Sequence, residues 1–505
     1  MTGKVYLIGA GPGDYELLTL KGHRLLKEVD VIVYDRLASS KYLSLAKEGA
    51  KLIYVGKKSS NHYMKQEDIN QVLVQQAQAG KTVARLKGGD PYVFGRGGEE
   101  CQELLKNNIE FEVVPGITSA IGGLCYGGIP ITHRNFNSSF HVITGHLKDD
   151  TSKHDWSSIA KLNGTIVFLM GVSNLQKITD KLKVNGMDPS TDVALVQWAT
   201  RSYQKVAVGN LNTIVEEVKK KDISSPSIIV VGKVVSLQKQ LNFFNPEDKE
   251  LYGKNIVVTR SRAQSSQMVS MLENLGARVI EAPSIRISEI RDNQLEAEFE
   301  NIRNYHALIF TSSNSVKIFF DKLTRLKLDI RCLWGVKIYS MGSGTTKELN
   351  EYGLRPDFEA EKYVSESLCD KVENTLDLGA KILIPRAKKA REYMIDRLGK
   401  NYDINEIKIY ENIVGDISES DYEFLSTIDI DYITFTSSST VNNFHNLIKD
   451  RNIILPITAK NISIGPITSK TLASKGYTYI QSEKYDIDGV IDTIREDIRL
   501  KNKGV

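Results

Sequence analysis

Short apolar runs alternate with amphipathic, helix-like stretches through the first half of the chain. The run KVYLIGA over residues 4–10 is short and almost continuously apolar, which predicts a buried strand. A helical pattern follows over residues 15–29, and further strands are expected at 31–34, 52–55 and 82–86. Strands separated by helices indicate a mainly parallel α/β sheet, and such sheets bind ligands at the carboxyl ends of their strands. Glycine-rich or charged turns follow these predicted strands, so we expect a binding site there.

A second α/β segment begins near residue 111. Its apolar runs predict strands at 140–144, 165–170, 193–196 and 227–231. The two segments together predict an α/β region that occupies about the first 240 residues.

The pattern after this region repeats itself. A linker is expected near residues 244–253, where charge, Asn and Pro occur without periodicity. Beyond it, IVVTR at 256–260 matches ILIPR at 382–386, and LIFTSS at 308–313 matches ITFTSS at 433–438. Further matches keep the same order at an offset of about 125 residues. The repeat predicts two similar α/β lobes with a ligand-binding cleft between them.

Composition and charge narrow the class of protein. The 41% hydrophobic and 25% charged residues are ordinary for a globular chain, and a formal net charge of +4 lacks the basic excess of a nucleic-acid binder. No apolar run is long enough to span a bilayer, and the N-terminus lacks the apolar core and cleavage site of a signal peptide. The four cysteines form no CxxC pair and the eight histidines form no HExxH motif. We therefore expect a cytoplasmic protein that uses no metal and binds neither nucleic acid nor membrane.

The turn GAGPGD over residues 9–14 is the first candidate site. It is superficially similar to a dinucleotide fingerprint, and Asp35 lies about 20 residues on, where a ribose-binding acid is expected. However, Asp14 replaces the third glycine, and Pro12 stiffens the turn. The turn is therefore compatible with a generic strand–helix connection as well as with a nucleotide or adenosyl site. On this motif alone, an NAD-dependent oxidoreductase is an alternative.

The stretch RLKGGDPYVFGRGGEE over residues 85–100 carries the strongest chemical signal. Its five glycines expose backbone N–H groups and permit close approach of a ligand. Arg85, Lys87 and Arg96 place fixed positive charge beside that backbone. A flexible loop is the plain alternative, but the flanking strand-like segments favour a binding loop.

At these residues the chain resembles the uroporphyrinogen-III C-methyltransferases of the tetrapyrrole methylase family. The resemblance extends over nearly all of residues 4–243 and includes VYDRL, VVPGITSA, GIPITHR and VVGKVV. It implies a two-lobed methylase, usually a homodimer, with S-adenosyl-L-methionine (SAM) bound between the lobes. The implied reaction methylates C2 and C7 of uroporphyrinogen III and gives precorrin-2 and S-adenosyl-L-homocysteine.

The resemblance also implies roles for individual residues. Asp35 corresponds to a proposed proton acceptor and Lys57 to a proposed proton donor, with Arg96 as a rival candidate for the base. The implied substrate-facing residues are Arg96, Glu99, Arg134 and His146. The implied SAM contacts are Pro12, Gly88, Gly89, Asp90, Val93, Thr118, Ser119, Met170 and Ala199, the last of which is commonly glycine in relatives.

Several of these residues also have a plain structural interpretation. Asp35 could accept hydrogen bonds in a turn, Lys57 could lie at a solvated strand end, and His146 could bond a helix N-terminus. Met170 could be an ordinary core residue. The implied roles are chemically consistent, because arginine binds the carboxylates of such a substrate bidentately and carbon methylation needs a base for the departing proton.

Hydroxyl-rich strand ends mark the second half, with TSS at 311–313 and TSSS at 436–439. Ser and Thr at helix starts are usually caps, although the same N–H groups can also receive carboxylates. Arg260, Arg262 and the cluster Arg386, Lys388, Lys389 and Arg391 place positive charge nearby, where a solvated turn is the plain alternative. With IYENI and IGPITSK, this pattern resembles uroporphyrinogen-III synthase across about residues 253–500.

The second resemblance implies closure of linear hydroxymethylbilane to uroporphyrinogen III, with inversion of ring D through a spiro intermediate. Tyr410 corresponds to a tyrosine proposed to help expel the ring-A hydroxyl as water, and Ser437 and Thr468 correspond to hydroxyls of the cleft. A packed strand tyrosine is the plain alternative for Tyr410. For the whole region, the alternative is a non-catalytic, ligand-binding module.

These observations predict an α/β chain in which a two-lobed tetrapyrrole methylase precedes a two-lobed α/β uroporphyrinogen-III synthase with parallel sheets. The methylase would occupy residues 1–243, with lobes at about 1–112 and 113–243. The linker 244–253 would join it to the synthase at 254–505.

In relatives of the synthase the chain crosses twice between lobes. One lobe would therefore hold residues 254–285 plus 414–505, and the other 286–413. The bifunctional enzyme would act on small tetrapyrroles for sirohaem or cobalamin synthesis, and it would form a homodimer through its methylase half.

Overall fold

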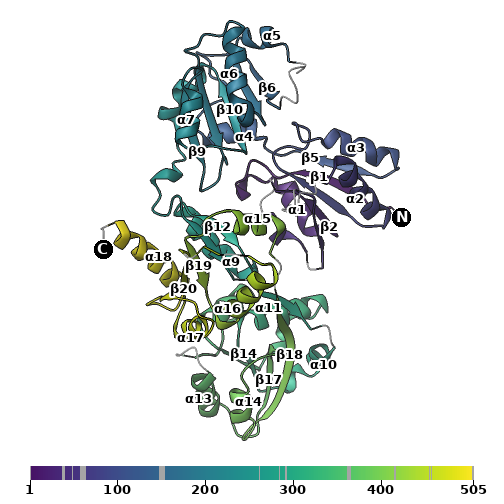
Figure 1. Cartoon of the computed structure of the whole chain (residues 1–505). Coiled ribbons are helices and arrows are strands. Elements are labelled where there is room, and N and C mark those ends of the chain that lie inside the picture. The colour runs from purple at the N-terminus through teal and green to yellow at the C-terminus, as the bar shows by residue number, and fades with distance from the viewer. Residues whose placement is uncertain are drawn as a thin grey trace. The chain divides into compact units, whose positions relative to one another are not determined.

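In the computed structural model of the chain, the described residues form four β-sheets with flanking helices (Figure 1). The structure describes all residues except Met1, 37–39, 48, 57–63, 147–153, 261, 284, 291–292, 361–364, 415–416, 454, 457 and 503–505. The chain divides into two compact units, one of Met1–Pro283 with Ile417–Val505 and one of Ser284–Asp416. Among the helices described, none combines the length and the apolar character needed to cross a membrane.

The first sheet is wholly parallel, as its alternation of strands and helices predicts. Its order is β3-β2-β4-β1-β5, with β1 Val5–Gly9, β2 Val31–Tyr34, β3 Lys51–Tyr54, β4 Val83–Lys87 and β5 Phe111–Val114. One face packs on α1 (Leu20–Glu28), and the other packs on α2 (Gln66–Gln78) and α3 (Gly97–Lys106). Successive side chains of β4 alternate between these faces, so Leu86 lies with α1 and Val83 with α2 and α3.

The second sheet is mostly antiparallel. Its order is β6-β7-β10-β8-β9, with β6 Phe140–Thr144, β7 Thr165–Leu169, β8 Asp192–Gln197, β9 Lys205–Asn210 and β10 Ser227–Val231. Only the β6–β7 pair of this described sheet is parallel. Helices α6 (Leu175–Val184) and α7 (Ile214–Lys220) cover one face, and α4 (Ser119–Tyr126) covers the other. The sheet therefore departs from the parallel pattern of the first, because its strands are joined partly by short connections that reverse direction.

The third sheet is parallel and draws its strands from two distant parts of the chain. Its order is β12-β11-β19-β20-β21, with β11 Asn255–Val258, β12 Arg278–Glu281, β19 Tyr432–Phe435, β20 Lys460–Ser463 and β21 Tyr479–Gln481. Strand β11 pairs with β19 although more than 170 residues separate them, as in the register Ile256 opposite Tyr432.

The fourth sheet lies within the unit Ser284–Asp416. Its order is β13-β18-β17-β14-β15-β16, with β13 Ile285–Glu289, β14 Ala307–Phe310, β15 Lys337–Ser340, β16 Phe358–Glu359, β17 Lys381–Ala387 and β18 Asp403–Val414. All its pairs are parallel except β13 with β18.

The repeated segments of the sequence occupy equivalent places in the third and fourth sheets. Strand β11 corresponds to β17, β19 to β14, β20 to β15 and β21 to β16. The first copy of the repeat places β11 and β12 in one sheet and β14 to β16 in the other, and the second copy does the reverse. Each sheet therefore combines strands from both copies, so a copy of the repeat is not by itself a lobe.

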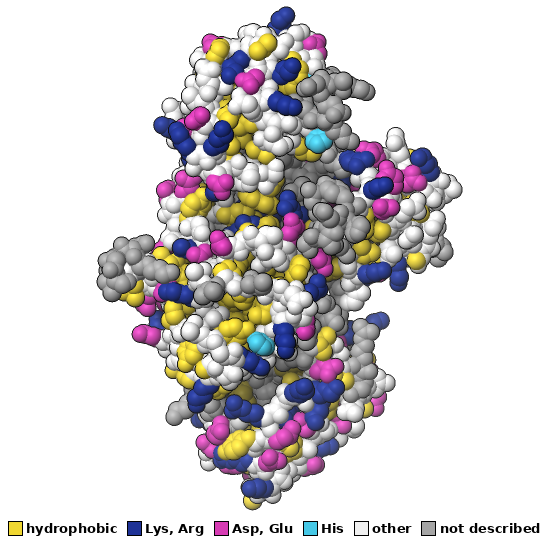
Figure 2. All heavy atoms as spheres, in the orientation of Figure 1, with side chains coloured by type: hydrophobic (Ala, Val, Ile, Leu, Met, Phe, Trp, Pro, Cys, Tyr) yellow, Lys and Arg dark blue, Asp and Glu magenta, His cyan; other side chains and the backbone are white. Residues whose placement is uncertain are grey.

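Acidic and basic side chains are intermingled over the face drawn in Figure 2. Many charged side chains of the described residues form local pairs, such as Arg24 with Glu28 on α1 at 3.0 Å.

Candidate functional site

The carboxyl ends of β1, β4 and β5 meet with almost no space between their backbones. Gly11 and Gly89 exchange backbone hydrogen bonds of 3.1 and 2.8 Å. A Cβ atom on Gly116 would lie 2.3 Å from the carbonyl oxygen of Gly89 and 2.7 Å from the Cα of Gly9. Glycine is required at residue 116 because any side chain would collide with backbone. We call these three loops, residues 9–13, 88–90 and 115–117, the glycine cradle.

Asp90 ties two loops of the glycine cradle together. Its Oδ2 accepts a hydrogen bond from the Gly116 N–H at 3.0 Å, and its Oδ1 accepts one from the Tyr92 N–H at 2.8 Å. The predicted positions Gly88, Gly89 and Asp90 therefore lie in the cradle. Through these hydrogen bonds, the Asp90 carboxylate holds the loops of the cradle together.

The start of α4 contacts the glycine cradle. A Cβ atom on Gly89 would lie 3.9 Å from both the Thr118 Cα and the Ser119 nitrogen. Thr118 is the N-cap of α4, and its hydroxyl accepts from the Ala120 N–H at 3.4 Å. Pro12 lies against the same helix, with its Cγ 3.2 Å from a Cβ placed on Gly122. The fold thus brings Pro12, Thr118 and Ser119 together.

The loop after β8 reaches the glycine cradle as well. The Asp14 N–H donates to Thr200 Oγ1 at 2.7 Å, and the Tyr126 hydroxyl donates to Asp14 Oδ2 at 3.0 Å. A Cβ atom on Gly13 would lie 3.2 Å from the Ala199 carbonyl oxygen. Ala199 is itself buried in the cluster that includes α4. Loops that follow strands of the first and second sheets therefore converge on the turn GAGPGD.

Val93 and Met170 differ in their surroundings. Val93 packs, partly buried, on the cluster formed by α4, β7 and β10. Met170 follows β7 with a left-handed φ of 58°, and its side chain is 53% exposed. This exposure excludes the interpretation of Met170 as a core residue. A methionine held out at a strand end is available for contact with a ligand.

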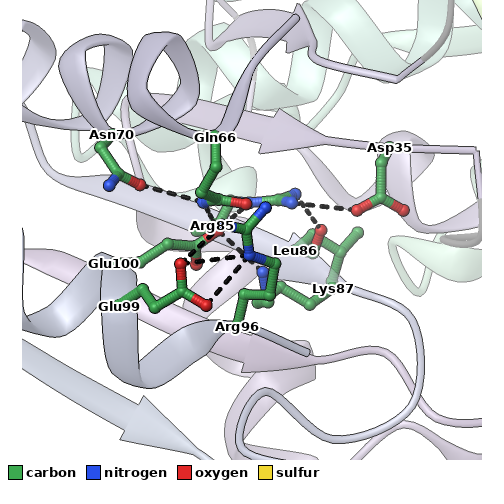
Figure 3. A network of polar contacts seen from close by, with 9 residues as sticks. All are labelled: Asp35, Gln66, Asn70, Arg85, Leu86, Lys87, Arg96, Glu99 and Glu100. Carbon is green, nitrogen blue, oxygen red and sulfur yellow. Dashed lines mark hydrogen bonds and ion pairs between the residues drawn. The ribbon is translucent and has the colours of Figure 1, made fainter. Parts of the chain in front are cut away.

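Asp35, at the end of β2, is joined to buried charged residues (Figure 3). Arg85 Nη2 donates to Asp35 Oδ2 at 3.0 Å, and Arg85 Nε donates to Glu100 Oε1 at 3.3 Å. Lys87 Nζ donates to the same Glu100 oxygen at 2.8 Å. Arg85, Lys87 and Glu100 are at most 5% exposed, whereas the Asp35 side chain is 25% exposed. We call these four residues the ionic network.

Burial and charge act against each other in the ionic network. Burial alone would lower the pKa of Arg85, but the neighbouring carboxylates of Asp35 and Glu100 outweigh it and raise that pKa. Burial lowers the pKa of Lys87, and the nearby Arg85 cation lowers it further. Arg85 therefore keeps its charge, and Lys87 is more easily neutralised than an ordinary lysine.

Arg96 and Glu99 form an exposed pair at the start of α3, and both belong to the predicted substrate-facing residues. Arg96 Nη2 lies 2.6 Å from Glu99 Oε2, and each side chain is about half exposed. The hydrogen bond to Glu99 raises the pKa of Arg96. A guanidinium held so firmly in its charged form is a poor proton acceptor, which argues against Arg96 as the base.

The remaining residues predicted for the first half of the chain are Arg134, His146 and Lys57. Arg134 lies in an exposed turn, and His146 is exposed just after β6, where its backbone N–H donates to Thr144 Oγ1 at 3.3 Å. Lys57, the predicted proton donor, lies outside the described residues.

In the unit Ser284–Asp416, Tyr410 of β18 is joined to the start of a helix. Its hydroxyl lies 3.0 Å from Ser312 Oγ, and the residue is 5% exposed. Ser312 is the N-cap of α11 (Ser313–Arg325) and accepts from the Ser315 N–H at 3.2 Å. Burial raises the pKa of the Tyr410 phenol, so its hydroxyl stays protonated at neutral pH. The arrangement provides a neutral hydroxyl pair at the carboxyl end of β14.

Ser437 and Thr468 belong to the other unit, at the ends of β19 and β20. Ser437 is the N-cap of α16 (Ser438–Asp450), accepts from the Thr440 N–H at 3.3 Å and lies 2.9 Å from the Ser439 hydroxyl. Thr468 lies in the first turn of α17 (Pro466–Ser474) and is only 4% exposed. The sequence predicts that the Thr468 hydroxyl lines a cleft, but the burial of this residue leaves its hydroxyl little access to a ligand.

Sequence reasoning missed two features. It recognised Arg85 and Lys87 as nearby charge but did not foresee their pairing with Glu100, although their spacing of two on a strand indicated one shared face. For the cluster that contains Arg386, the plain alternative of a solvated turn is wrong at Arg386 itself, and its burial was not foreseen. Arg386 is 2% exposed, and its Nε lies 2.9 Å from Glu406 Oε1 in an ion pair. Within the part of the chain that the structure describes, no group of three or more potential metal ligands occurs.

A parallel sheet with glycine-lined strand ends is typical of α/β proteins that bind small molecules at that edge. Residues 4–215 match the family model of Tetrapyrrole (Corrin/Porphyrin) Methylases, and residues 266–492 match that of Uroporphyrinogen-III synthase HemD. A relative from Ruminiclostridium josui named porphyrin biosynthesis protein HemD is 40% identical over 499 residues, which cover 98% of each chain. The chain belongs to this family, in which a tetrapyrrole methylase is joined to a uroporphyrinogen-III synthase. Both resemblances expected from the sequence are thereby confirmed.

Two further comparisons are with proteins named as C-methyltransferases. A Bacillus subtilis (strain 168) protein named uroporphyrinogen-III C-methyltransferase is 42% identical over 364 residues, covering 71% of this chain and 74% of the relative. A solved uroporphyrin-III C-methyl transferase from Thermus thermophilus, complexed with S-adenyl homocysteine, is 41% identical with a TM-score of 0.41, covering 46% of this chain and all of its own. The two family models and the full-length relative show that the protein is an enzyme of tetrapyrrole biosynthesis with a methylase half and a synthase half.

Proposed function

We propose that the chain carries out two successive steps on one substrate. The synthase half would close hydroxymethylbilane to uroporphyrinogen III, and the methylase half would transfer methyl groups from SAM to C2 and C7, giving precorrin-2. The match of both halves to one relative over 98% of its length is the observation that carries this proposal. The product would then serve sirohaem or cobalamin synthesis in the cytoplasm.

The glycine cradle suits the methyl donor. Its loops pack backbone against backbone at Gly9 and Gly116, whereas a Cβ atom on Gly89 would have no neighbour nearer than 3.9 Å. A ligand would therefore have room to approach the main chain at Gly89. Thr118, Ser119 and Ala199 line the same place, and the exposed Met170 would add an apolar contact. SAM, when bound there, supplies an electrophilic methyl group on a sulfonium.

Asp35 is our candidate for the proton acceptor. The new carbon–carbon bond forms with the electron pair of the pyrrole carbon, and a proton must then leave the substrate. Asp35 would take that proton, because its carboxylate is partly exposed while its other contacts are buried. Lys57 would return a proton, and Arg96, Glu99, Arg134 and His146 would hold the substrate carboxylates and pyrroles.

Tyr410 is our candidate for the catalytic group of the synthase half. Its protonated hydroxyl, held by Ser312 at 3.0 Å, could donate a hydrogen bond to the ring-A hydroxyl as that group leaves as water. Ser437, and less directly the buried Thr468, would bind substrate. We further infer that 1–243 and 254–505 are the two catalytic regions, with lobes as expected from the sequence, and that the protein dimerises through the methylase half.

The whole chain with hydroxymethylbilane tests both steps in one vessel. Without SAM, the expected product is the III isomer of uroporphyrinogen, and with SAM it gains two methyl groups by mass. Formation of the I isomer alone would show a non-catalytic C-terminal half. Tight binding of NAD with no binding of SAM would contradict the methylase proposal.

A further inference from the structure

The guanidinium of Arg85 is held in one plane by three different acceptors. Its Nε donates to Glu100, its Nη1 donates to the Leu86 carbonyl oxygen at 2.9 Å, and its Nη2 donates to Asp35. Figure 3 shows the guanidinium between Asp35 on one side and Glu100 on the other. Three bonds in different directions leave the fork no freedom to turn.

Stability alone does not account for the ionic network. Arg85 and Lys87 lie on the same side of β4 as Val83, which packs in an apolar cluster with α2 and α3. Burying charges costs desolvation, and apolar residues in place of a buried ion pair are often neutral or stabilising. Apolar residues in place of Arg85 and Lys87 would therefore stabilise the core equally well. The presence of charged residues needs another explanation.

Glu100 is placed to serve the two cations. It is completely buried, its Oε1 accepts from Arg85, Lys87 and Gln66, and its Oε2 has no hydrogen-bond partner among the described residues. Two cations and two carboxylates balance the network in charge. Asp35 is the member of the network that reaches solvent, at the strand edge where a ligand binds.

We propose that Arg85 is a positioning residue for methyl transfer: it holds the Asp35 carboxylate in one orientation toward the substrate, and Glu100 is the buried counter-ion that fixes Arg85. This inference rests on the proposed role of Asp35 as proton acceptor. Arg85 itself does not touch the substrate, because it is 3% exposed behind Asp35.

A charge-balanced double variant separates positioning from folding. Arg85→Met alone leaves Glu100 with less compensation and can unfold the sheet, whereas Arg85→Met with Glu100→Gln removes one charge of each sign. The matched control is Arg24→Met, which breaks the exposed pair with Glu28. The measurements are the affinity for S-adenosylhomocysteine, and kcat and KM for methylation of supplied uroporphyrinogen III.

The double variant should bind S-adenosylhomocysteine like the unaltered protein and keep its KM, while kcat falls by about 100-fold through lost alignment. Adding Asp35→Asn to it should lower kcat no further, since Arg85 acts through Asp35. Arg24→Met should leave all three quantities unchanged.

Three results would overturn the inference. These are an unchanged kcat in the double variant, a raised KM with unchanged kcat, and a further full loss on adding Asp35→Asn. Failure of the unaltered protein to bind S-adenosylhomocysteine would instead refute the proposed methylase function, so the two failures are distinguishable.

Discussion

Charged side chains form a buried network at the strand ends of the first sheet, whereas hydroxyls pair at the ends of β15 and β20 in the two synthase sheets. The methylase places Arg85, Lys87 and Glu100 in a buried network that reaches solvent through Asp35. In the fourth sheet, Ser340 bonds the Thr346 hydroxyl at 2.8 Å, which bonds Glu359 at 2.7 Å. The third sheet has a corresponding chain in Ser463, Ser469 and Gln481, at 2.7 and 2.8 Å. The repeat thus preserves a pair of hydroxyls, which ends on a carboxylate in the fourth sheet and on an amide in the third.

The two kinds of network differ in what they tolerate. A buried charge depends on its partner, and removing that partner leaves an uncompensated ion at high cost. A hydroxyl both donates and accepts, so it can find another partner at lower cost. Charges suit a site that must move a proton, whereas hydroxyls suit a site that holds a polar substrate without a fixed charge pattern.

Removal of the Glu100 carboxylate should have the largest effect on stability among the changes that test this comparison. Glu100→Ala leaves Arg85 and Lys87 buried without their shared carboxylate, so the free energy of unfolding should fall by about 3–5 kcal/mol. Urea unfolding measures this change in free energy. The relevant transition is the one whose midpoint rises to a higher urea concentration when S-adenosylhomocysteine is added. A loss below about 1 kcal/mol would show that the charges are not mutually dependent.

Glycines at the strand ends provide the second test. Gly116→Ala would place a Cβ 2.3 Å from the Gly89 carbonyl oxygen, whereas a Cβ on Gly344, at the start of α12 (Ser343–Glu351), would point into open space. Overpacking costs about 1–3 kcal/mol, so Gly116→Ala should weaken S-adenosylhomocysteine binding by about tenfold to hundredfold. Gly344→Ala should leave the cyclisation rate unchanged. Calorimetric titration and product assay measure these effects, and equal tolerance of both changes would contradict the cradle.

The equivalent serines of the two synthase sheets provide a smaller contrast. Ser312→Ala and Ser437→Ala each remove an N-cap, and each should cost about 1 kcal/mol of unfolding free energy. Of these two serines, only Ser312 bonds the Tyr410 hydroxyl, so Ser312→Ala should lower kcat for cyclisation by about tenfold. Ser437→Ala removes a proposed substrate contact and should raise KM with kcat unchanged. Tyr410→Phe should lower kcat at least as much as Ser312→Ala and leave methylation of supplied uroporphyrinogen III intact. An equal fall in kcat in both serine variants would show that Tyr410 is not the distinguishing feature.

The smallest expected effect is a pH dependence at Tyr126. Burial, with the hydrogen bond to Asp14, raises the pKa of Tyr126 to about 12, whereas an unfolded tyrosine ionises near 10. Between these values the unfolded chain loses a proton that the folded chain keeps, so stability falls as pH rises from about 10. Tyr126→Phe removes this contribution and should make the decline shallower in urea titrations at pH 9 and 11. Identical declines would contradict it.

Local patterns predicted the first sheet well and its neighbour less well. The expected strand 31–34 is β2, and the runs 4–10 and 82–86 contain or overlap β1 and β4, because buried parallel strands appear as continuous apolar runs. Four strands of the second sheet were also predicted, but β9 and the largely antiparallel pairing were not. The periodicity of apolar residues shows which side of a strand is buried, but it carries no information on whether neighbouring strands run parallel or antiparallel.

The synthase sheets show the same limit over longer distances. The matches near residues 256 and 382 indicated equivalent strands, and β11 and β17 do occupy equivalent places. The exchange of strands between copies depends on where the chain leaves one sheet for another. The exchange is fixed by pairings such as Ile256 with Tyr432, whose partners lie too far apart in the sequence for any short segment to contain both.

By itself, the sequence determined the type and order of the elements, the glycine-rich turns and both family memberships, because these depend on neighbours along the chain. Tertiary structure alone decided that Glu100 pairs with Arg85 and Lys87, that Ser312 meets Tyr410 and that Arg386 is buried. These contacts join different elements, and their geometry is set by strand order and helix packing. A charged side chain carries no local sign of whether it will meet water or a buried partner, since that depends on which surface the fold brings over it.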